Sequence, residues 1–191
     1  GYYFTIWAPR QTGKTWLMRQ VKKEIEARSD RFVFGSMSVQ GVIMEPDEPD
    51  KNFLKRIPQL MWETFVKKVP APPDWESFKN IFSKASELFN HPVILFIDEF
   101  DSLPPKVIDQ LVTLFRDMYL KRESYVLHGL VLIGVRAVLG VESHRGSPFN
   151  IQRSLHVPNL TEEEVRELYR QYQEESGQQI LPEVVGRVYA S

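Results

Sequence analysis

Residues 2–15 read YYFTIWAPRQTGKT, and this stretch decides the fold that the chain adopts. Its first part, residues 2–7, is a short aromatic and β-branched run of the kind that forms a buried strand. From Lys14 to about Arg28, apolar residues recur at a spacing of four, as they do on one face of a helix. The sequence therefore predicts a strand, a tight loop and a helix in succession.

The loop at residues 8–15 fits the phosphate-binding pattern G-x-x-x-x-G-K-[ST], except that Ala8 replaces the first glycine. Ala is the smallest alternative to Gly, so we expect a tolerated variation. Backbone amides and the positive end of the following helix would bind phosphate oxygens, and Gly13 lets the backbone approach them. Lys14 would contact the β- and γ-phosphates, and Thr15 would be a Mg²⁺ ligand. The predicted nucleotide-binding residues are Pro9, Arg10, Gln11, Thr12, Gly13, Lys14, Thr15 and Trp16.

A second apolar strand, residues 93–97, ends directly in Asp98 and Glu99. A carboxylate at that point is costly to bury unless it is paired or bound to a metal. We predict that Asp98 holds Mg²⁺ together with Thr15, and that Glu99 polarises the attacking water as a general base. The nearby Asp101 is expected to lie in a solvated loop, in which Asp101 or Ser102 caps the next helix.

Arg136 follows a third apolar strand, at residues 130–135. The phosphate loop, the acidic pair and Arg136 thus each follow the carboxyl end of a strand, which is where ligands bind in open α/β sheets. This coincidence predicts a site for ATP or ADP with Mg²⁺. Arg136 could sense the γ-phosphate, although a surface arginine is the alternative. The predicted catalytic residues are Lys14, Glu99 and Arg136, and the predicted metal ligands are Thr15 and Asp98.

Strands alternate with helices along the whole chain and are apolar on both faces, which predicts an α/β fold with a mostly parallel sheet covered on both sides. Two further strands are predicted at residues 31–38 and 155–157. Helices are predicted at 52–68, from Asp74 to about Phe89, from Pro104 onward, from a capping box at Thr161 and Glu164 to Gly177, and from Pro182. Trp62, Phe65, Phe78, Phe82 and Phe89 fall at helical spacing and are expected in the core.

The composition narrows the classes of protein. The chain has 191 residues, 42% of them apolar, and a net charge of −1, so charge gives no global reason to expect nucleic acid. The lack of cysteine excludes a disulfide scaffold and favours a cytoplasmic location. No apolar run reaches the roughly 18 residues of a membrane helix, so no membrane partner is expected. The first methionine is Met18, so we expect a piece of a longer protein.

Three motifs carry a resemblance to a known family: residues 8–15, VILFIDEFD at 93–101 and LVLIGVR at 130–136. In that order they resemble prokaryotic AAA-like P-loop ATPases close to the STAND group, which includes the NB-ARC proteins. The resemblance implies a P-loop NTPase fold with about five mostly parallel strands in the order 5-1-4-3-2. It also implies an ATPase core at residues 1–160 and the start of a C-terminal helical lid at 161–191.

The same resemblance implies a slow, Mg²⁺-dependent ATPase that acts as a nucleotide-dependent regulatory switch. Its partners would be other domains of a longer chain, with self-association as a further possibility. The nearest alternative is a DNA-associated ATPase of the origin-recognition or transposition-helper type, which needs a basic surface or an added domain. Two others stay open: a small-molecule kinase, and a protein that binds ATP without hydrolysing it, given Ala8.

Overall fold

The computed structural model describes residues 2–9, 12–45, 47–135 and 153–190. The chain forms two compact units, Gly1–Val157 and Pro158–Ser191, and each is described by itself. Within the described ranges, no helix is both long and apolar enough to cross a membrane.

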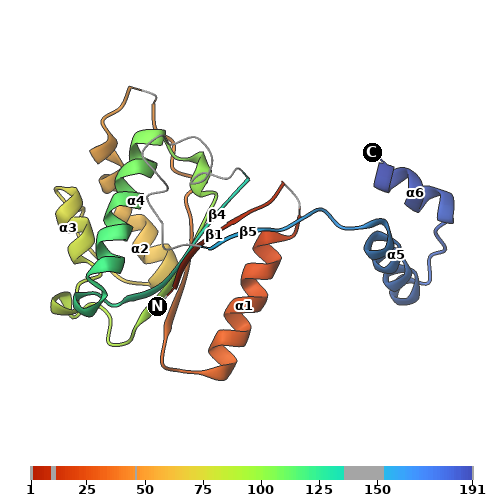
Figure 1. Ribbon diagram of the computed structural model, residues 1–191, viewed down its shortest axis with the longest axis horizontal. Coiled ribbons are helices and arrows are strands. Elements are labelled where there is room, and N and C mark those ends of the chain that lie inside the picture. The colour runs from red at the N-terminus through yellow and green to blue at the C-terminus, as the bar shows by residue number, and fades with distance from the viewer. Residues whose placement is uncertain (1, 10–11, 46, 136–152, 191) are drawn as a thin grey trace. The chain divides into compact units, whose positions relative to one another are not determined.

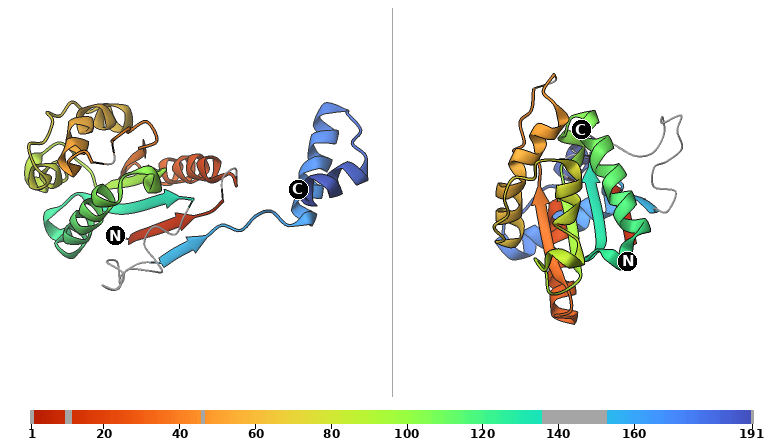
Figure 2. Two further views of the ribbon diagram at one scale, coloured as in Figure 1. Left: turned by 90° about the horizontal axis from the view of Figure 1, so that it is seen from above. Right: turned by 90° about the vertical axis from the view of Figure 1, so that its left-hand side faces the viewer.

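The first unit is built on a parallel sheet. Its strands are β1 (Tyr2–Trp7), β2 (Val33–Ser38), β3 (Val93–Asp98), β4 (Leu127–Gly134) and β5 (Arg153–His156). They lie in the order β2-β3-β4-β1-β5, and every neighbouring pair is parallel, as the arrows of β1, β4 and β5 in Figure 2 show. This is the predicted order 5-1-4-3-2 read from the other edge, so the predicted fold is confirmed.

Helices cover both faces of this sheet (Figure 1). The helix α1 (Lys14–Arg28) packs on one face, and α2 (Ile57–Phe65), α3 (Trp75–Asn80) and α4 (Pro105–Leu120) lie on the other. Alternate residues of β3 serve the two faces: Leu95 and Ile97 belong to the large core cluster, and Phe96 packs with Met18 of α1. Because both faces are covered, the strands are apolar throughout. Short 3₁₀ helices complete the unit at η1 (Asp50–Arg56), η2 (Lys84–Ser86), η3 (Phe100–Ser102) and η4 (Arg122–Ser124).

The helix predicted from Asp74 to about Phe89 is shorter than expected. Asp74 does cap α3, because its carboxylate accepts a hydrogen bond from the Ser77 amide at 2.7 Å. The helix nevertheless ends at Asn80. The Phe82 carbonyl then accepts a hydrogen bond from the Val126 amide at 2.9 Å, and Ser83 forms a β-bridge with Tyr125. Pairing with the chain ahead of β4 therefore replaces the helical hydrogen bonds that the aromatic spacing suggested.

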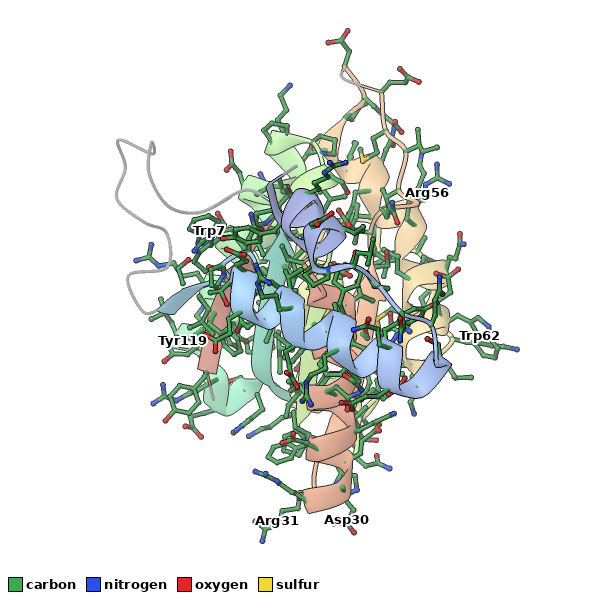
Figure 3. The ribbon with its side chains drawn as sticks, turned by 90° about the vertical axis from the view of Figure 1, so that its right-hand side faces the viewer. Trp7, Asp30, Arg31, Arg56, Trp62 and Tyr119 are labelled. Carbon is green, nitrogen blue, oxygen red and sulfur yellow. The ribbon has the colours of Figure 1, made fainter. Side chains whose placement is uncertain are left out.

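Trp62 is the exception among the aromatics expected in the core. Its side chain is 48% exposed and lies at the periphery of the unit, where the Lys68 ammonium sits 5.7 Å from the ring centroid (Figure 3). The prediction for Trp62 was therefore wrong, and a cation–π contact replaces burial. The other four behave as expected: Phe78, Phe82 and Phe89 are buried, and Phe65 packs against them.

The second unit contains α5 (Glu162–Ser176) and α6 (Pro182–Ala190). The predicted capping box is present, since the Thr161 hydroxyl accepts from the Glu164 amide and the Glu164 carboxylate accepts from the Thr161 amide. Gly177 ends α5 in the left-handed conformation, with φ 71°. The assignment of this unit as the start of a helical lid remains a prediction.

Candidate functional site

The phosphate loop joins the carboxyl end of β1 to the amino end of α1. Gly13 sits at the N-cap of α1 with φ 78°, a left-handed conformation that favours glycine. No acidic residue occupies the first turn of α1. The first-turn amides and the positive end of the helix dipole therefore present a surface suited to an anion.

Ala8 and Lys14 shape the interior of this loop. Ala8 is completely buried, at 0% exposure, and its amide donates to the Gly134 carbonyl at 3.2 Å. A small side chain is therefore required at this position. The Lys14 ammonium donates hydrogen bonds to the carbonyls of Ala8 and Pro9 at 3.0 and 2.6 Å. The backbone of the loop therefore fixes the position of this positive charge. Thr12 adds a hydrogen bond from its hydroxyl to the Pro9 carbonyl.

Thr15 and Asp98 come together from different elements. The Thr15 hydroxyl, on the first turn of α1, donates to the Asp98 carboxylate at 3.2 Å. Asp98 is the last residue of β3 and is only 9% exposed. Its second carboxylate oxygen accepts from the Glu99 amide at 2.9 Å, so both oxygens of the buried charge are hydrogen-bonded.

These two side chains form a donor set that suits magnesium. A hydroxyl and a carboxylate supply the oxygen ligands that Mg²⁺ prefers. Among the described residues, no group of three or more histidine or acidic side chains converges on a common point. A magnesium ion bound here would therefore take its remaining ligands from phosphate and water, as is usual for this ion.

Glu99 follows in a conformation that glutamate rarely adopts. Its φ is 58°, and it begins the short helix η3. A left-handed residue other than glycine costs on the order of 1 kcal/mol, and such strain tends to gather at functional sites. The turn is fixed on both sides, because the Ser102 amide donates to the Glu99 carbonyl at 2.8 Å and the Glu99 amide bonds to Asp98.

Asp101 does not cap the next helix as predicted. Pro104 occupies the N-cap of α4 and provides no side-chain cap. The Asp101 carboxylate instead accepts a hydrogen bond from the Val135 amide, just beyond β4, at 3.1 Å. A glycine at position 134 in the otherwise apolar run 130–135 is the signal that could have indicated a close approach there.

Five other residues were predicted to contact the nucleotide, and the structure describes only some of them. Pro9 and Trp16 are exposed beside the loop, Trp16 at 64%. Arg10, Gln11 and Arg136 lie outside the described residues, so their roles in binding and sensing remain predictions.

A separate cavity of about 560 Å³ lies at the opposite edge of the sheet. It is lined by residues at the beginnings of β3 and β4, such as Pro92 and Leu127, and by neighbouring side chains such as Tyr119. Lys14, Asp98 and Glu99 do not line it. The chemistry predicted from the sequence therefore gathers at the carboxyl ends of the strands, away from this cavity.

Comparisons with known proteins match the chain to one family. The family model described as "AAA domain" matches residues 2–141. A search of curated proteins finds no match.

The fold is similar to that of several solved structures. A Walker-type ATPase of Pyrococcus abyssi is 13% identical, with a TM-score of 0.61 over 98% of this chain and 58% of its own. The ORC2 protein of Aeropyrum pernix in its ADP form is 17% identical, with a TM-score of 0.60 over 91% and 46%. The replication initiator DnaA bound to AMPPCP and single-stranded DNA is 15% identical, with a TM-score of 0.53 over 98% and 49%. The chain thus spans about half the length of these proteins.

Proposed function

Because this chain belongs to the AAA domain family, we propose that it binds ATP with magnesium and hydrolyses it slowly as a nucleotide-dependent switch in the cytoplasm. The observation that carries the proposal is the contact between the Thr15 hydroxyl and the Asp98 carboxylate at 3.2 Å, at the base of the phosphate loop. It joins the two residues that the sequence predicts as metal ligands, although 83 positions separate them.

Each residue of the site has a distinct part in this proposal. The first-turn amides of α1, with Gly13, receive phosphate oxygens. When ATP binds, the Lys14 ammonium exchanges its hydrogen bonds to the carbonyls of Ala8 and Pro9 for contacts with the β- and γ-phosphates. Lys14 itself stays in the same place in the loop. The other residues predicted to contact the nucleotide are Pro9, Arg10, Gln11, Thr12 and Trp16.

Magnesium, held by Thr15 and Asp98, would offset the negative charge of the phosphates. Glu99 accepts a proton from the attacking water and orients it, and the fixed turn at η3 limits where its carboxylate can reach. Arg136 contributes a cation towards the γ-phosphate.

Among the possible settings for such a switch, we favour a DNA-associated one over a STAND-type signalling one. Support comes from the names of the similar structures, which include an ORC2 protein and a replication initiator bound to single-stranded DNA. The core itself suits both settings. Retention of the protein on single-stranded DNA, stronger with ATP and lost between about 50 and 200 mM salt, is the expected result. If the protein is not retained on single-stranded DNA even at low salt, with or without ATP, the STAND setting is favoured.

Calorimetry of Mg-ATP binding tests the proposal directly. Lys14→Ala removes a charge-assisted contact with phosphate and should weaken binding at least about tenfold. Lys23→Ala is the matched control, because Lys23 is an exposed lysine on the same helix. The Lys23→Ala variant should bind ATP with the affinity of the unchanged protein. If the unchanged protein gives no binding heat, or if both variants bind equally well, the proposal is wrong.

A further inference from the structure

The end of β4 is held by hydrogen bonds from two different loops. On one side, the Gly134 carbonyl accepts from the Ala8 amide of the phosphate loop at 3.2 Å. On the other side, the Val135 amide donates to the Asp101 carboxylate at 3.1 Å. Gly134, the last residue of β4, and Val135, the residue after it, therefore connect the phosphate loop with the acidic loop after β3. We call these two bonds the β4 clasp.

The fit between Asp101 and Gly134 leaves no room for a Cβ atom at position 134 unless the Asp101 side chain moves. A Cβ atom added to Gly134 would lie 2.6 Å from the Asp101 Oδ1 atom and 2.9 Å from its Cγ atom. Contacts that short do not occur without a shift of one partner. The strand thus uses a glycine where the carboxylate crosses its backbone.

The acidic loop after β3 is also held by the buried core and by its own backbone hydrogen bonds. Phe100, between Glu99 and Asp101, is 1% exposed and belongs to the large core cluster. Glu99 itself is held through its backbone by Asp98 and Ser102. The side chain of Asp101 is therefore the described link that ties the turn carrying Glu99 sideways to the neighbouring strand.

We propose that Asp101 is a positioning residue for ATP hydrolysis: by holding the Val135 amide, it fixes the acidic turn and the end of β4 against the phosphate loop. The turn that carries Glu99 then keeps a constant position relative to the phosphate loop. The proposal rests on the function proposed above. Asp101 is proposed as a positioning residue, because its carboxylate accepts from the Val135 backbone amide and would act on hydrolysis through the turn that carries Glu99.

Two substitutions separate the hydrogen bond from the charge. Asp101→Ala removes the acceptor, whereas Asp101→Asn keeps one carbonyl oxygen that can accept from the Val135 amide. Because a displacement of about 1 Å can slow an enzyme by roughly 100-fold, we expect Asp101→Ala to slow single-turnover hydrolysis by about 10- to 100-fold. Its affinity for Mg-ATP should stay within about threefold of the unchanged protein. Asp101→Asn should restore most of the rate.

The control is Asp109→Ala, an exposed aspartate on α4 whose removal should leave hydrolysis, ATP affinity and thermal midpoint unchanged. Gly134→Ala provides an independent arm, because its new methyl group pushes the carboxylate away from Val135 while the charge remains. It should slow hydrolysis in the same way as Asp101→Ala. Thermal midpoints of all variants show whether a lost rate reflects unfolding.

Three results would overturn the inference. The first is hydrolysis by Asp101→Ala at the unchanged rate. The second is a rate for Asp101→Asn as low as that for Asp101→Ala, which would show that charge and not the amide bond matters. The third is a loss of rate that is fully matched by a loss of folded protein.

Hydrogen exchange at the Val135 amide gives a readout that does not depend on activity. Protection should fall in Asp101→Ala and persist in Asp101→Asn. If the unchanged protein neither binds nor hydrolyses ATP, the proposed function fails, and the positioning role fails with it. If ATP is hydrolysed but the Val135 amide exchanges equally fast in all variants, the β4 clasp alone is refuted.

Discussion

Glu99 and Glu87 share a left-handed backbone, with φ 58° and 54°, but their surroundings differ. Glu99 follows Asp98, the proposed metal ligand at the carboxyl end of β3, whereas Glu87 is exposed after the short helix η2. Backbone conformation alone therefore does not mark a catalytic glutamate. The role proposed for Glu99 rests instead on its place next to Asp98 at the carboxyl end of β3.

We expect Glu99→Gln to bind Mg-ATP with unchanged affinity and to lose most of its hydrolysis. Removal of a general base typically lowers a rate by about 10²- to 10⁴-fold. Phosphate release in single-turnover conditions measures the rate, and calorimetry measures the affinity. Glu87→Gln is the matched control, with the same change on the same backbone conformation. An unchanged rate in Glu99→Gln would favour a domain that binds ATP without hydrolysing it.

Lys79 joins α3 to α4 through an ion pair that is largely shielded from water. Its side chain is 8% exposed, and its ammonium lies 2.8 Å from Asp117 and 2.8 Å from Glu76. Hydrogen bonds raise the pKa of Lys79, and the bond to Asp117 has a larger effect than the bond to Glu76. Hydrogen bonds from Lys121 and then Lys79 lower the pKa of Asp117 below its ordinary 3.8.

These directions fix how the ion pair depends on pH. A carboxylate whose pKa is lowered by folding stabilises the protein above its ordinary pKa of 3.8, and this contribution is lost as the pH falls through the lower folded value. The raised pKa of Lys79 acts at the other end, since its contribution is complete below 10.5 and is lost at higher pH. Between these limits the contribution is constant.

We expect Asp117→Asn to lower the free energy of unfolding by about 1–2 kcal/mol at pH 7, because Asp117 is partly exposed and its ion pairs are screened. The difference from the unchanged protein should shrink as the pH falls below 3.8. Urea unfolding at a series of pH values measures it. The control Asp109→Asn, on an exposed part of the same helix, should show no such trend. A difference that persists in acid would contradict the assignment.

At the scale of elements, β2 and α2 pack so closely that only a glycine fits between them. Gly35 is buried in β2, and a Cβ atom there would collide with the Phe65 ring at the end of α2. The ring has little room to move, because it also meets Phe89 edge-on at 5.0 Å between centroids. The Phe65 side chain of α2 therefore packs directly against the backbone of β2 at Gly35.

We expect Gly35→Ala to destabilise the first unit by about 1–3 kcal/mol, the usual effect of overpacking a core. Gly41→Ala is the control, because a Cβ atom at Gly41 meets nothing within 4 Å. Both substitutions remove the same backbone freedom from the unfolded chain, so the difference between them reports packing alone. Urea unfolding followed by tryptophan fluorescence gives both free energies. Equal stability of the two variants would show that the helix shifts to admit a methyl group.

Elements that depend on local chemistry were predictable from the sequence. The Asp74 cap, the capping box at Thr161 and Glu164, and the start of α4 at Pro105 all follow from side chains close in sequence. The strand order followed from a family resemblance, and the structure confirms it.

Features that depend on distant partners were not predictable. The end of α3 depends on pairing with the chain before β4, and the exposure of Trp62 depends on which face of α2 meets the sheet. The contact of Asp101 with Val135 spans 34 positions, so local rules assigned the carboxylate to the nearer helix. In the candidate site, the motifs identified Thr15 and Asp98, but they could not show how the loops around them are joined.

At the scale of the whole molecule, the two units are stabilised by different means. Every residue of the two buried clusters lies between Tyr3 and Ile133, within the first unit. In the second unit, α5 is supported by its capping box and by surface ion pairs along one helix, such as that of Arg170 with Glu174. Such exposed pairs contribute little to stability, because water and salt screen them. Among the described side chains of this unit, only Val185 is buried.

We therefore expect a chain that ends at Val157 to unfold cooperatively, with a thermal midpoint within about 3 °C of that of the 191-residue chain, because removal of the second unit changes the free energy of unfolding by less than about 1 kcal/mol. The circular dichroism of the 191-residue chain should contain an additional helical component that melts gradually over a wide range, as short helices without a core do. Tryptophan fluorescence follows the first unit selectively, because all four tryptophans precede Val157. A shortened chain that aggregates, or that melts far below the longer one, would show that α5 and α6 complete the core rather than extend it.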